Sequence, residues 1–382
     1  MFLIKKSRID RARAATSPAA KLAEIQSMLA TAVTIELSTL PPYLSAVFSA
    51  DPGSNREAVS IIQSVTVEEM LHMTLASNTL IALGGNPVIN DLDALPSYPG
   101  HLPDVAPDLV VTIKSLTREH VREVFMGIER PDTTASLPGE TKEEADYHRA
   151  LLSNDEYVSI GQFYAEIKSQ IEELAKIKPD LFECPRVDQQ VPATKYFNVQ
   201  FKDNPLGYVT SLESALDVID VIVEQGEGVQ IESDPIDPYT GRGGELAHYF
   251  KFGEVAFGRR LIRDPKDPSG YSYTGEPVPL DQDKIRTIVE NAALDDYPEG
   301  NIAHLPAQAF FDCFVRLLNS LHDAFNGEPE KMDKALSVMF ELRLAAFKVV
   351  DLTMPDSKAV KVHGGPPFQM KRGQMKRGTV AS

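Results

Sequence analysis

Two Glu-x-x-His pairs and one further glutamate occupy positions in this sequence where apolar residues are expected. Glu36 lies on the same helical line as neighbouring leucines and valines. Two pairs, Glu69 with His72 and Glu245 with His248, lie on the apolar lines of two other segments. Glutamate and histidine three residues apart face the same side of a helix, about one turn apart. These five residues therefore predict carboxylate and imidazole groups that point into a helical core.

Buried charges of this kind need compensation. An ionised carboxylate buried without a partner costs several kcal/mol, and no inward lysine or arginine is expected beside these glutamates on their helices. Two divalent or trivalent metal ions would supply the positive charge. Four-helix bundles hold such a pair with one glutamate from each of two helices and Glu-x-x-His from each of the others. The pattern predicts a dinuclear metal site with one glutamate still to be placed.

Three glutamates are candidates for this sixth ligand. Glu227 is preferred, because it lies at the edge of an apolar stripe and because a hairpin would bring it level with Glu245. Glu224 is second, since it lies about 60° beyond that stripe, and Glu166 is third, at roughly 110° from the stripe of its own segment.

Side chains next to the ligands are expected to orient or tune them. The candidates are Tyr43, Tyr249 and Glu254. No glycine-rich phosphate loop, nucleophile elbow or Walker-type lysine is present in the sequence. The chemistry is therefore expected to depend on the metal ions.

The elements that would position these residues are mainly helical. Long segments with a 3.6-residue apolar period alternate with stretches rich in proline and glycine. The fold is expected to be mainly α: a four-helix bundle with inserted loops at 14–262, a C-terminal helical extension at 263–355 and a basic disordered tail at 356–382. Helices are expected at 17–49, 55–83, 118–128, 142–177, 212–227, 245–262, 283–297, 306–326 and 329–353, with one short β-like run at 109–113.

Composition excludes several classes of protein. The 382 residues include 55 acidic and 38 basic ones, and a formal net charge of −17 repels nucleic-acid backbones. The two cysteines lie far apart and predict neither a disulfide framework nor a thiolate metal site. No secretion signal and no apolar run long enough for a membrane span are found, so we expect a cytoplasmic protein.

Five motifs resemble the ferritin-like family that includes the iminophenylpyruvate dimer synthases of bisindole pathways such as violacein biosynthesis. The resemblance spans roughly residues 18–262 and lies in 35–43 (IELSTLPPY), 68–72 (EEMLH), 159–164 (SIGQFY), 223–228 (VEQGEG) and 245–252 (ELAHYFKF). It implies two iron ions, with manganese as an alternative. The implied ligands are Glu36, Glu69, His72, Glu227, Glu245 and His248.

The resemblance implies an oxidase or oxygenase that uses O2 or peroxide on a small molecule, for example one derived from an amino acid. Two other activities are compatible with the same metal site: a manganese-catalase-like peroxide dismutase and an iron-storage or ferroxidase protein. The expected partners are a small-molecule substrate, an electron donor that the sequence does not identify, and further copies of the chain in a homo-oligomer.

Overall fold

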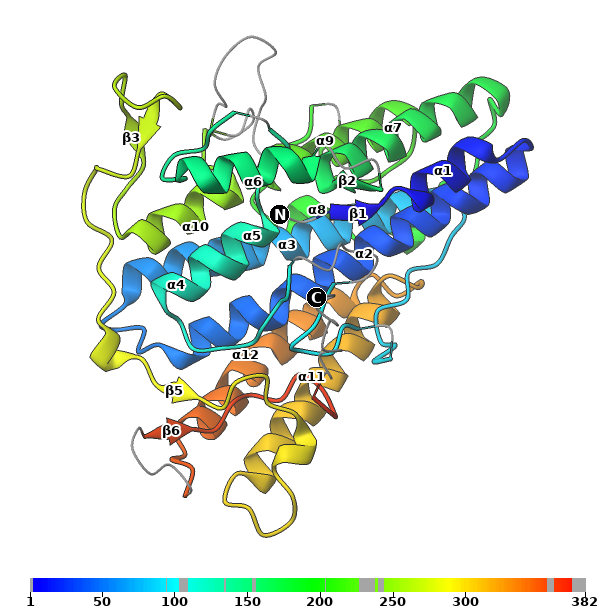
Figure 1. Ribbon diagram of the computed structural model, residues 1–382. Coiled ribbons are helices and arrows are strands. Elements are labelled where there is room, and N and C mark those ends of the chain that lie inside the picture. The colour runs from blue at the N-terminus through cyan, green and yellow to red at the C-terminus, as the bar shows by residue number, and fades with distance from the viewer. Residues whose placement is uncertain are drawn as a thin grey trace, which may run out of the picture.

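Two long antiparallel helices form the centre of the molecule. They are α2 (Pro18–Ser49) and α3 (Arg56–Ala82), which pack against each other along their lengths (Figure 1). The Ser17 side chain caps α2 by accepting the Ala20 N–H at 3.2 Å, and a short turn at 51–54 joins the two helices. The computed structural model describes residues 3–93, 95–102, 109–133, 135–152, 156–202, 204–226, 238–239, 244–355 and 361–372.

Shorter helices complete the bundle around α2 and α3. At one end α7 packs against α2 and α9, and α9 packs against α3; toward the other end α10 packs against α3 and a segment made of α4, η1 and α5 (Figure 1). Several helix ends therefore meet beside the middle of α2 and α3, where a site can form. The elements are α4 (Arg118–His120), the π-helical turn η1 (Val121–Phe125), α5 (Met126–Ile128), α7 (Ile160–Ile177), α9 (Leu212–Gly226) and α10 (His248–Phe257).

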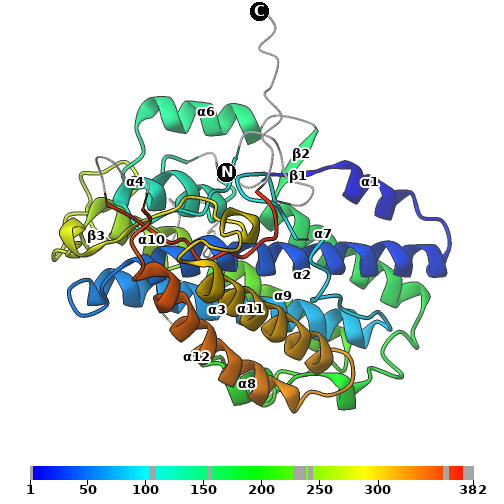
Figure 2. The same cartoon turned by 90° about the horizontal axis from the view of Figure 1, so that it is seen from below.

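A C-terminal pair of helices packs beside this bundle. The helices α11 (His304–Ala324) and α12 (Lys331–Val350) pack against each other, and α12 contacts α2 (Figure 2). One continuous hydrophobic core runs from Ile4 to Phe368 and includes both parts. The remaining elements are β1 (Leu3–Lys5), α1 (Ser7–Ala14), α6 (Lys142–Leu152), β2 (Tyr157–Ser159), η2 (Val187–Gln189), α8 (Ala193–Tyr196), β3 (Ile262–Arg263), β4 (Tyr271–Ser272), η3 (Gln282–Lys284), β5 (Thr287–Ile288), η4 (Leu294–Asp296) and β6 (Val362–His363).

The mainly α architecture is confirmed, but two expected helices have different limits and the expectation of a third is wrong. The segment 142–177 contains two helices, because β2 pairs with β1 and the Ser159 hydroxyl caps the start of α7 by accepting the Gln162 N–H at 3.0 Å. The helix expected at 245–262 is shorter: α10 begins at His248 and ends at Phe257, where it is capped by Gly258, whose φ of 74° is left-handed. The helix expected at 283–297 is wrong, since β5 pairs in parallel with β6 there.

Part of the tail that was expected to be disordered packs against the body. The Phe368 ring lies 4.9 Å from that of Phe310 and 5.0 Å from that of Phe314, between centroids. The Gln369 side chain donates to the Tyr98 carbonyl at 2.7 Å. Apolar burial and hydrogen bonding thus order the described part of the tail, residues 361–372, against the prediction. The division of the chain into domains stays a prediction.

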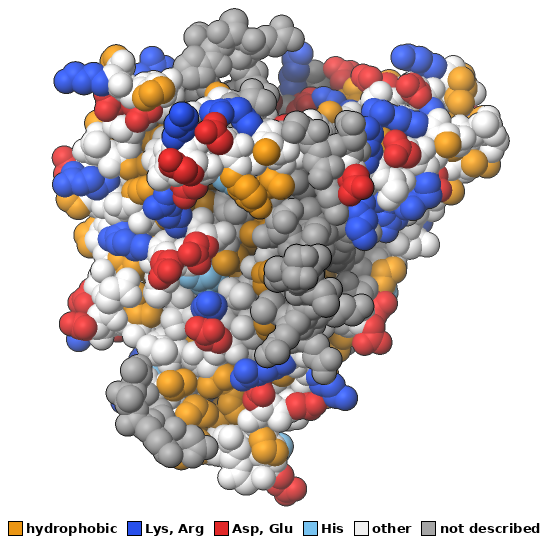
Figure 3. Space-filling view, in the orientation of Figure 1, with side chains coloured by type: hydrophobic (Ala, Val, Ile, Leu, Met, Phe, Trp, Pro, Cys, Tyr) orange, Lys and Arg blue, Asp and Glu red, His pale blue; other side chains and the backbone are white. Residues whose placement is uncertain are grey.

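The surface carries charges of both signs. On the face shown in Figure 3, lysine and arginine side chains alternate with aspartate and glutamate, without a broad basic patch among the described residues. No helix in the described ranges is both long and apolar enough to cross a bilayer.

Gly253 allows α10 to lie close to the loop that contains β4. A Cβ atom at this position would overlap the Tyr273 hydroxyl. The Tyr273 side chain is buried, and its ring is stacked on that of Phe257. Alanine usually stabilises a helix relative to glycine, but Gly253→Ala is expected to lower the free energy of unfolding by about 1–3 kcal/mol through overpacking. Denaturant titration checks this against Gly226→Ala in α9, where a Cβ contacts nothing within 4 Å. Equal or higher stability of Gly253→Ala would contradict the tight packing of α10.

Candidate metal centre

Five buried side chains converge beside the middle of α2 and α3. Glu36 comes from α2, Glu69 and His72 come from α3, and His248 is the first residue of α10. Glu129 directly follows α5. Each of the five exposes less than a tenth of its surface. The structure thus joins four of the predicted ligands with one glutamate that the sequence analysis did not select.

Glu69 lies at the centre of the group. Its Oε1 atom is 2.9 Å from His248 Nδ1 and 3.8 Å from His72 Nδ1. Glu36 Oε2 lies 3.7 Å from His72 Nδ1, and Glu129 Oε2 lies 3.5 Å from His248 Nδ1. The two imidazole rings are stacked, with centroids 5.2 Å apart. Both Nδ1 atoms therefore face carboxylates, and one carboxylate lies between them.

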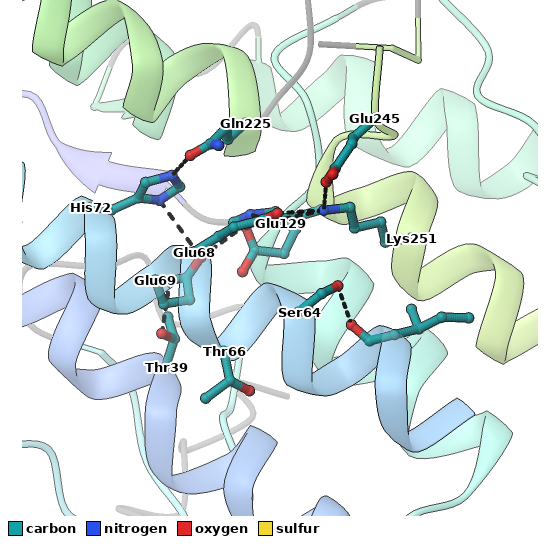
Figure 4. A network of polar contacts seen from close by, with 12 residues as sticks. Thr39, Ser64, Thr66, Glu68, Glu69, His72, Glu129, Gln225, Glu245 and Lys251 are labelled. Atoms are coloured by element: carbon teal, nitrogen blue, oxygen red, sulfur yellow. Dashed lines mark hydrogen bonds and ion pairs between the residues drawn. The ribbon is translucent and has the colours of Figure 1, made fainter. Parts of the chain in front are cut away.

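The other nitrogen of each histidine is held from outside the group. His72 Nε2 lies 3.0 Å from Gln225 Oε1 (Figure 4). His248 Nε2 lies 2.8 Å from Glu68 Oε2. Histidines that bind metals usually donate their second ring N–H to such an acceptor, which fixes the ring and leaves the first nitrogen free for the ion. This arrangement leaves both Nδ1 atoms facing the centre of the group, where they can act as metal ligands.

Three hydroxyl groups orient the three carboxylates. The Tyr164 hydroxyl donates to Glu36 Oε1, and the Tyr43 hydroxyl donates to Glu129 Oε1. Thr39 Oγ1 donates to Glu69 Oε2 at 2.8 Å. Burial, together with the nearby carboxylates, raises the pKa of both tyrosines well above the ordinary value. Both phenols therefore keep their protons at neutral pH.

The centre holds more negative charge than the chain itself compensates. Within the described residues, every ion pair of Glu36, Glu69 and Glu129 is with a histidine. Burial raises the pKa of Glu69 well above the ordinary value, and the charges of Glu129 and Glu36 raise it further. Burial opposes a charge on His248, but Glu129, Glu68 and Glu69 raise the pKa of its imidazole well above the ordinary value.

This donor set fits metal ions. His248 Nδ1 is buried and has no hydrogen bond of acceptable geometry, although two carboxylates lie near it. Carboxylate and imidazole donors without thiolates suit iron or manganese and disfavour a structural zinc site. Glu69, His72 and His248 each offer a ligand atom within 4.8 Å of the others.

The space between these groups is small. A cavity of about 40 Å³ is lined by Glu36, Glu69, His72 and Glu129, and isoleucines such as Ile35 form part of its walls. A water molecule needs roughly 10–15 Å³ of such a cavity. The cavity suits ions and molecules the size of water or dioxygen, and its apolar walls limit entry of bulk water.

The remaining predicted ligands lie elsewhere. Glu245 precedes α10 in an extended segment and is largely exposed, with its carboxylate 3.1 Å from Lys251 Nζ. Glu227 lies outside the described residues, and Glu224 lines a separate pocket. Glu166 is paired with Arg13 through two contacts of 3.0 and 2.6 Å. Glu245 and Glu227 stay predictions as metal ligands.

Of the three residues expected around the ligands, one lies beside the centre and two lie elsewhere. Tyr43 contacts the Glu129 carboxylate, whereas Tyr249 lines a pocket with Arg130 and Glu140. Glu254 is paired with Arg260 and accepts the Leu261 N–H at 3.0 Å, so it stabilises the end of α10.

Sequence reasoning missed Glu129 and Lys251. Glu129 lies four and eight residues after Phe125 and Val121, which are both buried, so the helical spacing could have identified it. The expectation of no inward cation on these helices is wrong: Lys251 on α10 is buried, with its Nζ 2.6 and 2.8 Å from the two Glu68 oxygens. Its partner Glu68 also reaches His248 with its carboxylate.

A buried ion pair holds the segment that carries Glu129. Arg130 Nε lies 2.9 Å from Glu140 Oε1, and His148 Nδ1 lies 3.0 Å from the same oxygen. Burial opposes the charge on Glu140, but its hydrogen bonds to His148 and Arg130 and the charge of Arg130 lower its pKa to about 2. The pair fixes the backbone next to Glu129 and so restricts where that carboxylate can lie.

The metal-free protein is expected to be less stable at about pH 8 than at about pH 5.5. Folding raises the pKa values of Glu69 and His248, so their protonated forms stabilise the fold, and this contribution is lost as the pH rises through the raised values. Bound metal would remove the deficit by compensating the charge and by mass action. Thermal melts of chelated and metal-loaded protein at both pH values check this. Equal melting temperatures of the two forms at the higher pH would show that no metal organises this centre.

Comparisons with known proteins agree with this geometry. A family profile described as ferritin-like matches residues 29–256. Dichlorochromopyrrolate synthase from Lentzea aerocolonigenes is 26% identical over 262 residues, which are 59% of this chain and 23% of that protein. The match thus spans about a quarter of that relative's length. A ferritin-like protein from Caulobacter vibrioides shares the fold, with a TM-score of 0.50 and 20% identity over 84% of this chain and 95% of that chain.

Proposed function

Since the chain belongs to the ferritin-like family, as its motifs predicted, we propose that it is a non-haem di-iron oxidase or oxygenase that acts on a small organic molecule. The observation that carries this proposal is the orientation of the two histidines. Both Nδ1 atoms face the Glu36, Glu69 and Glu129 carboxylates, while both Nε2 atoms are held from outside. The named relative is a synthase, which supports a biosynthetic reaction.

Glu36, Glu129, His72 and His248 would hold the two ions together with Glu69, whose carboxylate lies between the two histidines. The bound pair would supply redox chemistry with O2 or peroxide. The protein's own groups keep this region dry and fix the ligands. Tyr164 Oη holds a proton against Glu36 Oε1, Tyr43 Oη does the same at Glu129 Oε1, and Thr39 Oγ1 restrains the bridging carboxylate.

Oxygen uptake tests the proposal. Protein reconstituted anaerobically with Fe(II) is expected to consume O2, and to consume more when a suitable organic substrate and an electron donor are present. Absence of O2 uptake by the iron-loaded protein would contradict the oxidase assignment. Rapid peroxide dismutation by manganese-loaded protein without any organic substrate would instead indicate a catalase-like enzyme, and a large assembled shell in light scattering would indicate iron storage.

A further inference from the structure

An organic substrate needs more space than the metal cavity offers. A larger pocket beside the centre, here called the outer pocket, has about 550 Å³ and lies between α3, the segment 197–200 and the end of α9. Its wall includes Glu68 and Gln225, the two residues that hold the Nε2 atoms of His248 and His72. The outer pocket is therefore one side chain away from both histidines of the metal centre.

A second large pocket, of about 720 Å³, is less suited to bind a ligand by its charged groups. It is lined by Arg118, Arg122 and Arg130 among others. Arg118 donates to the carbonyls of Val255 and Val278, Arg122 pairs with Glu144, and Arg130 pairs with Glu140. These arginines are engaged within the protein, and the outer pocket is the stronger candidate because Glu68 and Gln225 of its wall contact both histidines of the centre.

The wall of the outer pocket combines an apolar side with neutral polar groups. Leu71, Phe197 and Val221 are buried and form part of the apolar side. Gln63 and Gln200 contribute amides that form no hydrogen bond to another described residue. This combination suits a ligand with an aromatic or aliphatic body and a few polar atoms.

The charges on the wall favour a cation. Leaving aside Glu224, which has a partner of its own, the described wall holds two carboxylates, Glu68 and Glu245, against one basic residue, Lys251. The Lys251 ammonium is already compensated, because its Nζ lies 2.6 and 2.8 Å from the Glu68 oxygens and 3.1 Å from Glu245 Oε2 (Figure 4). A carboxylate or phosphate would therefore meet net repulsion, whereas an ammonium group would be attracted.

We propose that the outer pocket binds the organic substrate and that this substrate carries an amine on an apolar, aromatic or aliphatic, body. The assignment rests on the proposed function only in that the enzyme has an organic substrate. The Leu71 side of the pocket receives the apolar body, and the exposed Glu245 carboxylate receives the ammonium group.

Two probes of matched size test this: phenethylamine and phenylacetate, titrated by calorimetry into the metal-loaded protein near neutral pH. Phenethylamine is expected to bind at least about tenfold more tightly, a difference of about 1.4 kcal/mol. Val67 lines the pocket and is 47% exposed, so Val67→Trp is expected to weaken phenethylamine binding at least about tenfold by filling the space. Val88→Trp is the control, because Val88 is 56% exposed and is not among the residues that line the pocket.

Three results would overturn the proposal: tighter or equal binding of phenylacetate, unchanged phenethylamine binding in Val67→Trp, or no saturable binding of phenethylamine at about 10 mM. Metal content is measured on the same samples. Probe binding without metal binding would refute the di-iron function and retain the pocket, and metal binding without probe binding would do the reverse.

Discussion

A Glu69→Gln variant is expected to lose the metal pair. The Glu69 carboxylate lies between the two histidines, with Oε1 2.9 Å from His248 Nδ1 and 3.8 Å from His72 Nδ1. Glutamine keeps the shape but has no charge and one oxygen fewer, so it cannot bridge two cations. Loss of an outer partner already costs roughly 10–100-fold in metal affinity, and loss of the bridge is expected to cost more. Elemental analysis after anaerobic reconstitution with Fe(II) should show a fall from about two ions per chain to well below one.

Glu166→Gln is the matched control for this experiment. Glu166 is also a buried glutamate on a helix of the bundle, but its carboxylate is paired with Arg13 and accepts from Gln170. Its substitution is expected to leave the metal content nearly normal. Full metal content in Glu69→Gln, or loss in Glu166→Gln alone, would contradict the arrangement of ligands described above.

Glu129→Gln is expected to weaken metal binding by at least about tenfold, whereas Glu245→Gln should change it little. Glu129 Oε2 lies 3.5 Å from His248 Nδ1, and its Oε1 accepts from Tyr43. Glu245 lies outside the centre and contacts Lys251. Metal titration monitored by absorbance distinguishes the two variants.

The opposite order of effects would show that Glu245 enters the centre when metal binds and that Glu129 only accepts hydrogen bonds. Glu227→Ala belongs in the same series. The sequence-based expectation is that this variant loses metal, and the titration tests that expectation directly.

Helical periodicity predicted much of the fold and of the centre. Glu36, Glu69 and His72 lie within long helices whose apolar lines are regular, so the 3.6-residue period placed their side chains correctly in the core. Helical periodicity was a poorer guide near the ends of helices. Glu245 fits the helical line of α10 only if that helix begins three residues earlier, but Leu246 pairs with Tyr239 in a β-bridge and keeps this segment extended.

Contacts between distant segments were not predictable from local patterns. Glu129 enters the centre because the short helices α4 and α5 pack across α10. Gln225 reaches His72 from outside the centre because α9 ends beside that histidine. The same applies to Lys251, whose partner Glu68 is far away in the sequence. Local periodicity gives the face of a helix and leaves the identity of the neighbouring element open.

The central claim is that two metal ions share the Glu69 carboxylate. Elemental analysis combined with EPR spectroscopy of the iron-reconstituted, oxidised protein tests it most directly. We expect about two irons per chain, coupled to each other through the bridging ligand and therefore silent in EPR. Iron content of one per chain or less, or an isolated high-spin ferric signal that accounts for the bound iron, would contradict the claim.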